Sequence, residues 1–203
     1  MGKNTGGMGA YSPSRLINTE LEKKILDKII KPTLKALNDM KTSYKGFLYA
    51  GLMIVKNEPY LIEYNVRMGD PECQTILPKL NSDLFDIFIA CCTKKLNEIE
   101  IKWHNKKSLC TVLCSNGYPE NFKKNVLIKD INKIILNKND YCYHAGTNKN
   151  QGKIYAVGGR VLNFVSLSDD FLKSRSQTHQ LIKLLNWDGG FFRKDIGHKV
   201  INE

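Results

Sequence analysis

A helical repeat of apolar residues follows the first eighteen positions of the chain. A Thr-x-x-Glu capping box at Thr19 and Glu22 predicts where this helix begins. Pro32 lacks an N–H and clashes with the preceding turn, so we expect a kink or a restart of the helix there. The helix should end near Met40. Its apolar stripe consists of Leu21, Ile25, Ile29, Leu34 and Leu37.

Two apolar runs then predict a β-hairpin. Residues 46–55 and 60–66 are rich in residues that favour strands. The polar residues 56–58 form the turn between them, and Pro59 leads into the second strand. We therefore expect an antiparallel pair in the first half of the chain.

Two helices are predicted after the hairpin. Asp70 followed by Pro71 is typical of an N-cap with proline at the first helical position, and this helix should end near residue 80. Asp83 caps a second helix over residues 84–96. Because the second helix is largely apolar, we expect it to be well buried.

The second half of the chain reads as a small α+β domain. The polar stretch 94–107 is the best boundary, which gives domains at 1–103 and 104–203. Residues 168–170 should cap a last helix, and the tail 186–203 looks irregular. The overall expectation is an α+β fold with an antiparallel sheet and helices. The strand-like runs of this half are 109–114, 126–128, 141–145, 153–157 and 159–167.

Charge alone does not identify a partner for this chain. Among 203 residues there are 26 Lys and five Arg against 20 Asp and Glu, a formal net charge of +11. The lysines are scattered over predicted turns and helices, whereas a nucleic-acid surface gathers Arg and aromatic residues on one face. We therefore expect no nucleic-acid partner. A basic RNA-binding module is the alternative from another class, and its affinity would fall steeply with salt.

Composition indicates a soluble globular protein. With 42% hydrophobic and 25% charged residues, the chain can bury a core. Its longest apolar stretch, around 84–92, is far shorter than the roughly 20 residues that cross a bilayer. The N-terminal residues lack the apolar segment of a signal peptide. We expect a cytoplasmic protein with no membrane partner.

The six cysteines show no metal-binding pattern. There is no C-x-x-C pair, and no histidine lies at ligand spacing from a cysteine pair. Cys110 and Cys114 would share one face of a strand. We expect reduced cysteines that act as small apolar residues.

Three polar residues alternate along the second strand of the predicted hairpin. Glu63, Asn65 and Arg67 would line one face because side chains two apart point the same way. A carboxylate beside an amide oxygen suits Mg²⁺, which takes few protein ligands. Arg67 could hold a carboxylate or phosphate. The alternative is a polar strand face with a weak ion pair. The residues expected to face the core are Ile62, Tyr64 and Val66.

The glycine-rich segment 4–13 is a second candidate site. Its glycines would let backbone N–H groups approach and cradle an anion. It lacks the G-K-[ST] ending of a P-loop and shows no strand or helix period. The alternative is a mobile tail.

Two polar residues lie beside glycines in the second half of the chain. His144 precedes an Ala-Gly-Thr turn, and Arg160 follows Gly158 and Gly159. Each could contact a ligand phosphate. Alternatively, His144 is a hydrogen-bonded residue at a strand end, and the two glycines form a hairpin turn.

Together, these segments resemble one enzyme family over residues 4–199. In chain order they are NTGGMGAYSP, GFLYAGLMI, IEYNVRMGDPE, SDL, NGYP, HAGT, GGRVL and WDGGFFRKDIG. This order resembles that of the glycinamide ribonucleotide synthetases, or phosphoribosylamine–glycine ligases. The resemblance implies the C-terminal part of an ATP-grasp fold for 1–103 and the small C-terminal domain of the ligase for 104–203.

The resemblance also implies an activity in de novo purine biosynthesis. Members of the family use ATP to convert glycine to glycyl phosphate, which the amine of 5-phosphoribosylamine attacks to give glycinamide ribonucleotide, ADP and phosphate. Glu63 and Asn65 match the ligands of Mg²⁺ or Mn²⁺, and Arg67 is the expected catalytic residue. The expected substrate-binding residues are Asn4, Thr5, Gly6, Gly7, Gly9, Gly69, Asp70, Glu72, His144 and Arg160.

Family members are about twice the length of this chain. The part that they have in addition carries the lysines and the glycine-rich lid that grip ATP. We therefore expect little activity from the chain alone and a separately encoded N-terminal half as a partner. The alternative is a non-catalytic, truncated remnant of the ligase. Decay should have eroded the motif around Glu63 and Asn65, and that motif is intact.

Overall fold

The computed structural model describes residues 3–185 and 187–201. The chain divides into two compact units, and each is described by itself. Unit 1 comprises Met1–Pro13, Asp70–Lys79 and His104–Glu203, and unit 2 comprises Ser14–Gly69 and Leu80–Trp103. One unit boundary coincides with the predicted boundary at residue 103, but unit 1 also takes two earlier segments. The domain assignment from sequence stays a prediction.

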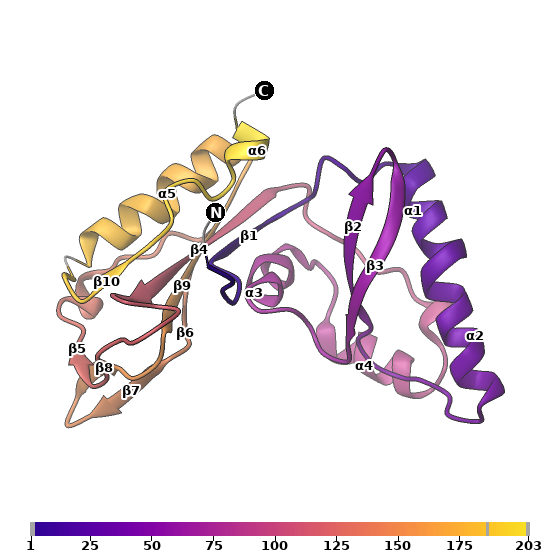
Figure 1. Cartoon of the computed structure of the whole chain (residues 1–203), viewed down its shortest axis with the longest axis horizontal. Helices are drawn as coiled ribbons and strands as arrows, with labels where there is room; N and C mark the ends of the chain where they lie inside the picture. The colour runs from indigo at the N-terminus through magenta and orange to yellow at the C-terminus, as the bar shows by residue number, and fades with distance from the viewer. Residues whose placement is uncertain (1–2, 186, 202–203) are drawn as a thin grey trace. The chain divides into compact units, whose positions relative to one another are not determined.

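An antiparallel sheet forms the centre of unit 1 (Figure 1). Its two long strands are β4 (Lys107–Ser115) and β9 (Arg160–Ser168), which pair along most of their length. On the far side of β9 lies β6 (Asp140–His144). The other side of β4 pairs first with β1 (Gly9–Ser12) and then with β10 (Gly190–Phe191).

Both faces of this sheet are covered by apolar side chains. One face packs against α5 (Phe171–Leu184), which begins where the Asp170 carboxylate accepts a hydrogen bond from the Lys173 N–H at 2.7 Å. The other face holds a second cluster, whose buried members are Met8, Cys110, Val112, Cys114, Val165 and Leu167. The sheet is therefore the buried centre of the core of unit 1.

Shorter elements complete unit 1. A small antiparallel sheet consists of β5 (Val126–Leu127), β8 (Lys153–Ala156) and β7 (Thr147–Asn150). The segment around residue 75 forms α3 (Glu72–Ile76) and the 3-10 turn η2 (Leu77–Lys79). The remaining elements are the 3-10 turn η4 (Ile131–Lys133) and α6 (His198–Ile201).

Unit 2 combines helices with a two-stranded hairpin (Figure 1). The first helical stretch is α1 (Thr19–Ile25), a π-helical turn η1 (Leu26–Ile30) and α2 (Lys31–Asp39). The hairpin strands are β2 (Tyr49–Val55) and β3 (Glu58–Asn65). Then come α4 (Leu84–Cys92) and the 3-10 turn η3 (Leu96–Glu98). No helix among the described residues has the length and hydropathy needed to span a membrane.

The first helix departs from the capping expected from sequence. Its N-cap is Asn18 rather than Thr19, because the Asn18 side chain accepts a hydrogen bond from the Leu21 N–H at 2.8 Å. The interruption expected at Pro32 is confirmed. The π-helical turn directly precedes α2, and Pro32 falls in the first turn of α2, where a missing N–H is tolerated.

The predicted N-cap role of Asp70 is wrong. The helix α3 begins at Glu72 after Pro71, and no side chain caps it. The Asp70 carboxylate instead accepts hydrogen bonds from Arg160 and Gln74. A guanidinium ninety residues along the chain thus takes the carboxylate that local sequence assigned to the helix end.

The predicted burial of α4 is also wrong. Asp83 does cap this helix by accepting from the Phe85 N–H at 2.7 Å, but the helix ends at Cys92. Only Ala90 is buried along it, whereas Phe85 is 67% exposed. Likewise Ile62 and Val66, expected in the core, are exposed. The β2–β3 pairing skips Ile62 at a bulge, and Val66 lies beyond the end of β3.

Three strands were not expected from the sequence. The segment 4–13 contains β1, which forms only by pairing with β4 about a hundred residues later. Strand β7 has four residues and β10 has two, and the tail that looked irregular contains β10 and α6. Within that tail, residues 186 and 202–203 lie outside the described residues. The segments that form these three strands show no clear apolar alternation, so local periodicity did not identify them.

Candidate functional site

Glu63 and Asn65 lie side by side on β3, as the two-residue spacing predicts. The Asn65 Nδ2 donates a hydrogen bond to the Glu63 Oε1 at 3.0 Å. Their partners across the hairpin are Gly51 and Tyr49. A Cβ at Gly51 would lie 3.1 Å from the Glu63 Cγ, so the missing side chain gives the carboxylate room over β2. We call Glu63 and Asn65 the strand pair.

The strand pair points away from the helical stretch α1–α2. Tyr64, between the two residues, points the other way, and its hydroxyl lies 2.7 Å from the Thr33 Oγ1 and donates to the Ile29 carbonyl at 3.1 Å. The helical stretch α1–α2 therefore fixes the rotation of β3. The carboxylate and the amide are left on the opposite, open face of the hairpin.

The donors of the strand pair fit a small hard cation. A carboxylate oxygen and an amide oxygen are ligands that Mg²⁺ accepts, and Mg²⁺ usually completes its shell with water and substrate phosphates. Among the described residues no group of three or more His, Cys, Asp or Glu side chains could hold a metal ion.

Arg67 lies just beyond the strand pair at the end of β3. Its side chain is exposed, and its Nη1 donates to the Met68 carbonyl at 3.0 Å. Gly69 follows and is buried. These two residues and the strand pair belong to unit 2, whereas every other predicted site residue belongs to unit 1.

Arg160 connects two predicted site segments in unit 1. Its Nη1 donates to the Gly7 carbonyl at 3.2 Å and to the Asp70 carbonyl at 2.8 Å. Its Nη2 forms an ion pair with the Asp70 carboxylate at 2.8 Å. We call Gly6, Gly7, Asp70, Tyr118 and Arg160 the Arg160 cluster. The guanidinium thus holds the glycine-rich segment beside the residues that follow β3.

The glycines of segment 4–13 are needed for close approach. A Cβ at Gly7 would lie 2.4 Å from the Pro71 Cδ, and one at Gly9 would lie 2.6 Å from the Ile196 Cγ2. Met8 between them is buried in the apolar cluster of the sheet. Residues 6–9 are therefore a packed part of unit 1 and not a mobile tail. Of the two residues before them, Asn4 is exposed and Thr5 is half-buried.

Tyr118 belongs to the Arg160 cluster, although it is not among the site residues predicted from the sequence. Its hydroxyl accepts a hydrogen bond from the Gly6 N–H at 2.9 Å, and its ring lies where a Cβ of Gly159 would be, at 2.3 Å from the Tyr118 Cδ2. The NGYP turn that contains Tyr118 was the available signal. A Tyr hydroxyl can accept a hydrogen bond from a backbone N–H as well as donate one.

Lys79 is a second polar residue that sequence reasoning missed. It is buried, and its Nζ donates to the Ser12 Oγ at 3.3 Å. Burial lowers the pKa of this amine, and the charge of Lys107 lowers it further. Both of its neighbours belong to unit 1, like Lys79 itself. A lone Lys at the end of a short helix gave no signal in the sequence.

His144 adopts the strand-end geometry named as its structural alternative. It is the last residue of β6, it is exposed, and its Nδ1 lies 2.8 Å from the Thr147 Oγ1.

The hairpin turn suggested at Gly158 and Gly159 is wrong, because these glycines join β8 to β9, which belong to different sheets. Glu72 is the first residue of α3 and is half-buried.

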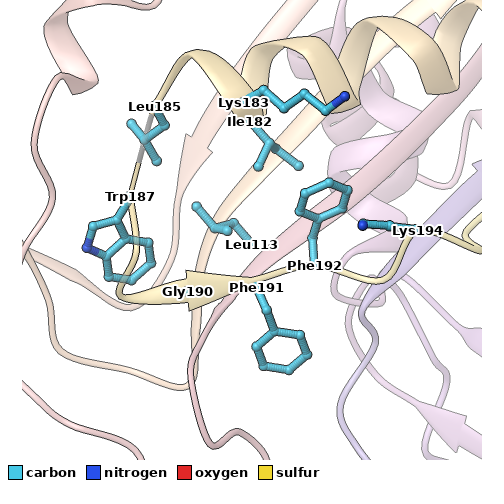
Figure 2. A pocket seen from close by; sticks show the side chains of 9 residues that line it. All are labelled: Leu113, Ile182, Lys183, Leu185, Trp187, Gly190, Phe191, Phe192 and Lys194. Carbon is cyan, nitrogen blue, oxygen red and sulfur yellow. The ribbon is translucent and has the colours of Figure 1, made fainter.

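A cavity of about 270 Å³ lies beside α5 in unit 1 (Figure 2). Figure 2 shows Trp187 and Phe192 on either side of Leu113. The glycines of the WDGGFF segment make this arrangement possible, because a Cβ at Gly190 would lie 2.4 Å from the Trp187 Cζ3. This segment therefore has a structural explanation: the indole folds back over its own backbone.

Cys110 and Cys114 are buried, as the sequence predicts for small apolar residues, whereas Cys92 is exposed. Cys110 and Cys114 share one face of β4 with Val112, in the cluster around Met8. Burial raises the pKa of the Cys110 thiol and raises that of Cys114 to about 12. Thiols with such raised pKa values are poor nucleophiles near neutral pH.

Comparison with family models divides the chain into two matched parts. Residues 1–73 match "Phosphoribosylglycinamide synthetase, ATP-grasp (A) domain", and residues 108–199 match "Phosphoribosylglycinamide synthetase, C domain". Both matched regions carry residues of the candidate site. The strand pair falls in the first match, and Arg160 falls in the second.

Curated relatives and solved structures agree with this match. The chain is 38% identical to a phosphoribosylamine–glycine ligase from Brucella melitensis and 40% identical to one from Vibrio parahaemolyticus. Each alignment covers 98% of this chain but 47% of the relative, so the chain spans about half the length of the curated relatives it matches. A crystal structure of the Thermotoga maritima ligase matches 97% of the chain and 48% of its own, with TM-score 0.78 and 30% identity.

A more distant neighbour shows the fold alone. The biotin carboxylase domain of a thermophilic 2-oxoglutarate carboxylase matches 92% of the chain with TM-score 0.64 at 12% identity. The predicted α+β class with an ATP-grasp part is therefore confirmed.

Proposed function

Because the chain belongs to the phosphoribosylglycinamide synthetase family, we propose that it supplies the metal and substrate side of a phosphoribosylamine–glycine ligase. In this reaction the γ-phosphoryl group of ATP passes to the glycine carboxylate and ADP leaves. The amine nitrogen of 5-phosphoribosylamine then bonds to the acyl carbon of glycyl phosphate. Phosphate leaves with the acyl–oxygen bond electrons, and the amine loses a proton to give glycinamide ribonucleotide.

The observation that carries the proposal is the strand pair. Glu63 and Asn65 present their oxygens on the open face of the hairpin, and Gly51 leaves room for the carboxylate. We propose that they hold Mg²⁺ or Mn²⁺. When bound, such an ion neutralises charge that develops on the transferred phosphoryl group. Asn65 orients the Glu63 carboxylate through its amide, so loss of either residue should weaken the site.

Arg67 is proposed as the catalytic residue next to the metal site. It follows the strand pair on the same chain segment, and its guanidinium is exposed to a ligand. A planar guanidinium suits the paired oxygens of a carboxylate or an acyl phosphate. We propose that Arg67 steadies these oxygens while the phosphoryl group is transferred.

The Arg160 cluster is proposed as the substrate-binding part of unit 1. Arg160 fixes the backbone of Gly7 and the carboxylate of Asp70. Such a network places exposed polar groups without reorganisation when substrate binds. The proposed substrate-binding residues are those expected from the family: Asn4, Thr5, Gly6, Gly7, Gly9, Gly69, Asp70, Glu72, His144 and Arg160. For His144, the hydrogen bond with Thr147 supports a structural role at the end of β6 as well as it supports substrate binding.

We propose that a complete ATP site also needs the part of the ligase that this chain does not span. The chain spans about half of its relatives, and the part that grips ATP is expected in the other half. A separately encoded N-terminal half is therefore the proposed partner. The expected cytoplasmic location and the absence of a nucleic-acid partner stay predictions.

ADP release tests this function directly. The purified chain, ATP, Mg²⁺, glycine and phosphoribosylamine are assayed with and without a separately expressed N-terminal half of the Vibrio parahaemolyticus ligase. We expect turnover in the mixture only. Glu63→Ala should abolish it, and Glu98→Ala, which removes an exposed carboxylate of unit 2, should leave it intact. Full turnover by the Glu63→Ala mixture would contradict the metal role.

A non-catalytic remnant is the second candidate. It predicts no turnover in any mixture although the chain is folded. The intact strand pair and Arg160 cluster favour the ligase, because a chain under no selection has no reason to keep these contacts.

A further inference from the structure

The cavity beside α5 has apolar walls that include two aromatic rings. Leu113, Ile182 and Leu185 line it from the core of unit 1, and each of these side chains is more than nine-tenths buried. Trp187 and Phe192 are half-buried and lie on either side of Leu113 (Figure 2). Walls of this kind suit a flat apolar molecule, because its faces can contact both the aromatic rings and the aliphatic side chains.

The volume of the cavity limits the size of a ligand. It is about 270 Å³, whereas pockets for drug-sized ligands measure roughly 300–1,000 Å³. The cavity therefore suits a molecule of one or two rings. Two glycines maintain its shape, because a Cβ at Gly189 or Gly190 would lie 2.6 or 2.4 Å from an atom of the Trp187 ring.

Two lysines give the cavity a positive charge. Lys183 lies on α5, Lys194 follows β10, and both line the cavity. Figure 2 shows both amine groups on the Phe192 side, away from Trp187. Neither amine forms an ion pair or a hydrogen bond with another residue that the structure describes. Among the described residues that line the cavity, none is acidic.

The surroundings of the cavity are positive as well. His179 lies one turn before Lys183 on α5, and its ring contacts that of Phe192 at 4.9 Å between ring centroids. Burial lowers the pKa of His179, and the charges of Arg175, Lys183 and Lys194 lower it further. All three of these charges are positive, so the potential at this end of the cavity favours an anion.

Two acidic residues are near the cavity in sequence, but neither balances this charge. The Asp195 carboxylate forms an ion pair with Arg193. Asp188 is exposed and does not line the cavity. An apolar cavity of this size with unpaired amines at one end is complementary to a ring that carries one negative charge.

We propose that this cavity binds a small aromatic carboxylate, with its ring between Trp187 and Phe192 and its carboxylate at Lys183 and Lys194. We call this cavity the α5 site. The aromatic walls recognise the ring, and the two amines recognise the charge. A ligand that lacks either part should therefore bind more weakly.

The α5 site is separate from the candidate ligase site. It lies on the sheet face that α5 covers, whereas Met8 and Tyr118, which hold the glycine-rich segment, pack on the other face. Binding at the α5 site should therefore need neither ATP nor a metal ion. The purified chain alone is sufficient for its test.

A titration followed by nuclear magnetic resonance tests the α5 site. The probe is 2-naphthoate, a flat carboxylate of two rings, and the reporter is the indole N–H signal of Trp187. The chain has one other tryptophan, Trp103, which is 50% exposed in unit 2 and reports adsorption to exposed apolar surface. Trp103→Phe assigns the two signals. We expect a saturable shift at Trp187 and none at Trp103. No shift at Trp187, or equal shifts at both, would overturn the proposal.

Two further probes separate the ring from the charge. The neutral 2-naphthamide keeps the shape and loses the charge, so it should bind at least about fivefold more weakly than 2-naphthoate. Acetate keeps the charge and lacks the rings, and it should not shift the Trp187 signal at the same concentrations. If 2-naphthamide binds as tightly as 2-naphthoate, or acetate binds as tightly as either, the proposed ligand class is wrong.

Matched variants locate the carboxylate. Lys183→Met and Lys194→Met keep the long side chain and remove the charge, and each should weaken 2-naphthoate binding about two- to fivefold. Lys173→Met makes the same change ten residues earlier on α5, outside the cavity, and should leave the dissociation constant unchanged. Circular dichroism establishes that each variant is folded. Equal affinity in all three variants would overturn the proposal.

Discussion

The guanidinium of Arg160 binds the carboxylate and the carbonyl of Asp70 at the same time, each at 2.8 Å. These residues are ninety positions apart, and Gly7 joins them as a third partner at 3.2 Å. A planar, multivalent donor can hold three chain segments in one arrangement where a lysine could not. The relationship explains why unit 1 includes residues from the start and the middle of the chain.

Arg160→Ala should therefore destabilise unit 1. Three hydrogen bonds are lost, but Arg160 and Asp70 are partly exposed, so we expect a loss of about 1–2 kcal/mol rather than the full value for charged pairs. Urea unfolding measures it. Arg193→Ala, which removes an exposed ion pair with Asp195, is the control and should cost less than about 1 kcal/mol. Equal losses would show that the Arg160 contacts contribute no more than a surface pair.

Asp140 is a buried, hydrogen-bonded residue at the start of β6. It is 6% exposed, and its carboxylate accepts from Ser166 at 2.8 Å and from Gln177 and Asn137 at 2.9 Å. Asp140→Ala leaves these donors without an acceptor and should cost about 3 kcal/mol. Thermal unfolding measures the loss, with the exposed Asp188→Ala as control. A change within error of that control would contradict the prediction.

The pH dependence of stability should carry a contribution from His179. Burial lowers the pKa of this imidazole, and the charges of Arg175, Lys183 and Lys194 lower it further. Below about pH 6.5 the unfolded chain gains a proton that the folded chain resists, so stability should fall as the pH drops from that value. The Nε2 of His179 is buried without a hydrogen-bond partner among the described residues, in agreement with a neutral ring.

Replacement of His179 isolates this contribution. His179→Leu should flatten the slope of unfolding free energy between pH 6.5 and 5, while the exposed His104→Leu should leave it as in the wild type. The measurement is urea unfolding at a series of pH values. An unchanged slope in His179→Leu would show that other groups cause it.

Metal binding by the strand pair can be measured apart from turnover. In the mixture with the N-terminal half and ATP, Glu63→Gln and Asn65→Leu should each weaken Mn²⁺ binding at least about tenfold. Electron paramagnetic resonance of free Mn²⁺ gives the affinity. Glu98→Gln is the matched control. Tight binding in both strand-pair variants would place the ion elsewhere.

Gly7 should not tolerate a side chain. A Cβ there would lie 2.4 Å from the Pro71 Cδ and 3.0 Å from the Asp70 carbonyl oxygen, so the segment must shift. Overpacking of this kind costs about 1–3 kcal/mol. Gly7→Ala should lower the melting temperature, and Thr5→Ala in the same segment should not. A melting temperature equal to wild type would mean that the loop is free to move.

The structural features predicted correctly from the sequence are those that residues close together in the chain determine. The hairpin turn predicted at residues 56–58, the cap of α5 and the two-residue spacing of Glu63 and Asn65 are local, and the structure confirms them, with Glu58 already in β3. Strand β1 and the partner of Asp70 depend on residues about ninety to a hundred positions away, which no local pattern reports. The exposure of Phe85 was missed for a related reason: apolar content predicts that a residue needs cover, not which segment supplies it.

The chain passes between the two units after residues 13, 69, 79 and 103, which constrains the order in which they can fold during synthesis. All of unit 2 has left the ribosome before most of unit 1 has been made. Strand β1 must then wait, unpaired, for β4, and Asp70 must wait for Arg160. Such long sequence separations slow folding, because the loop must close before the contact is formed. A nascent chain stalled before residue 160 would thus hold its glycine-rich segment without the contacts that fix it.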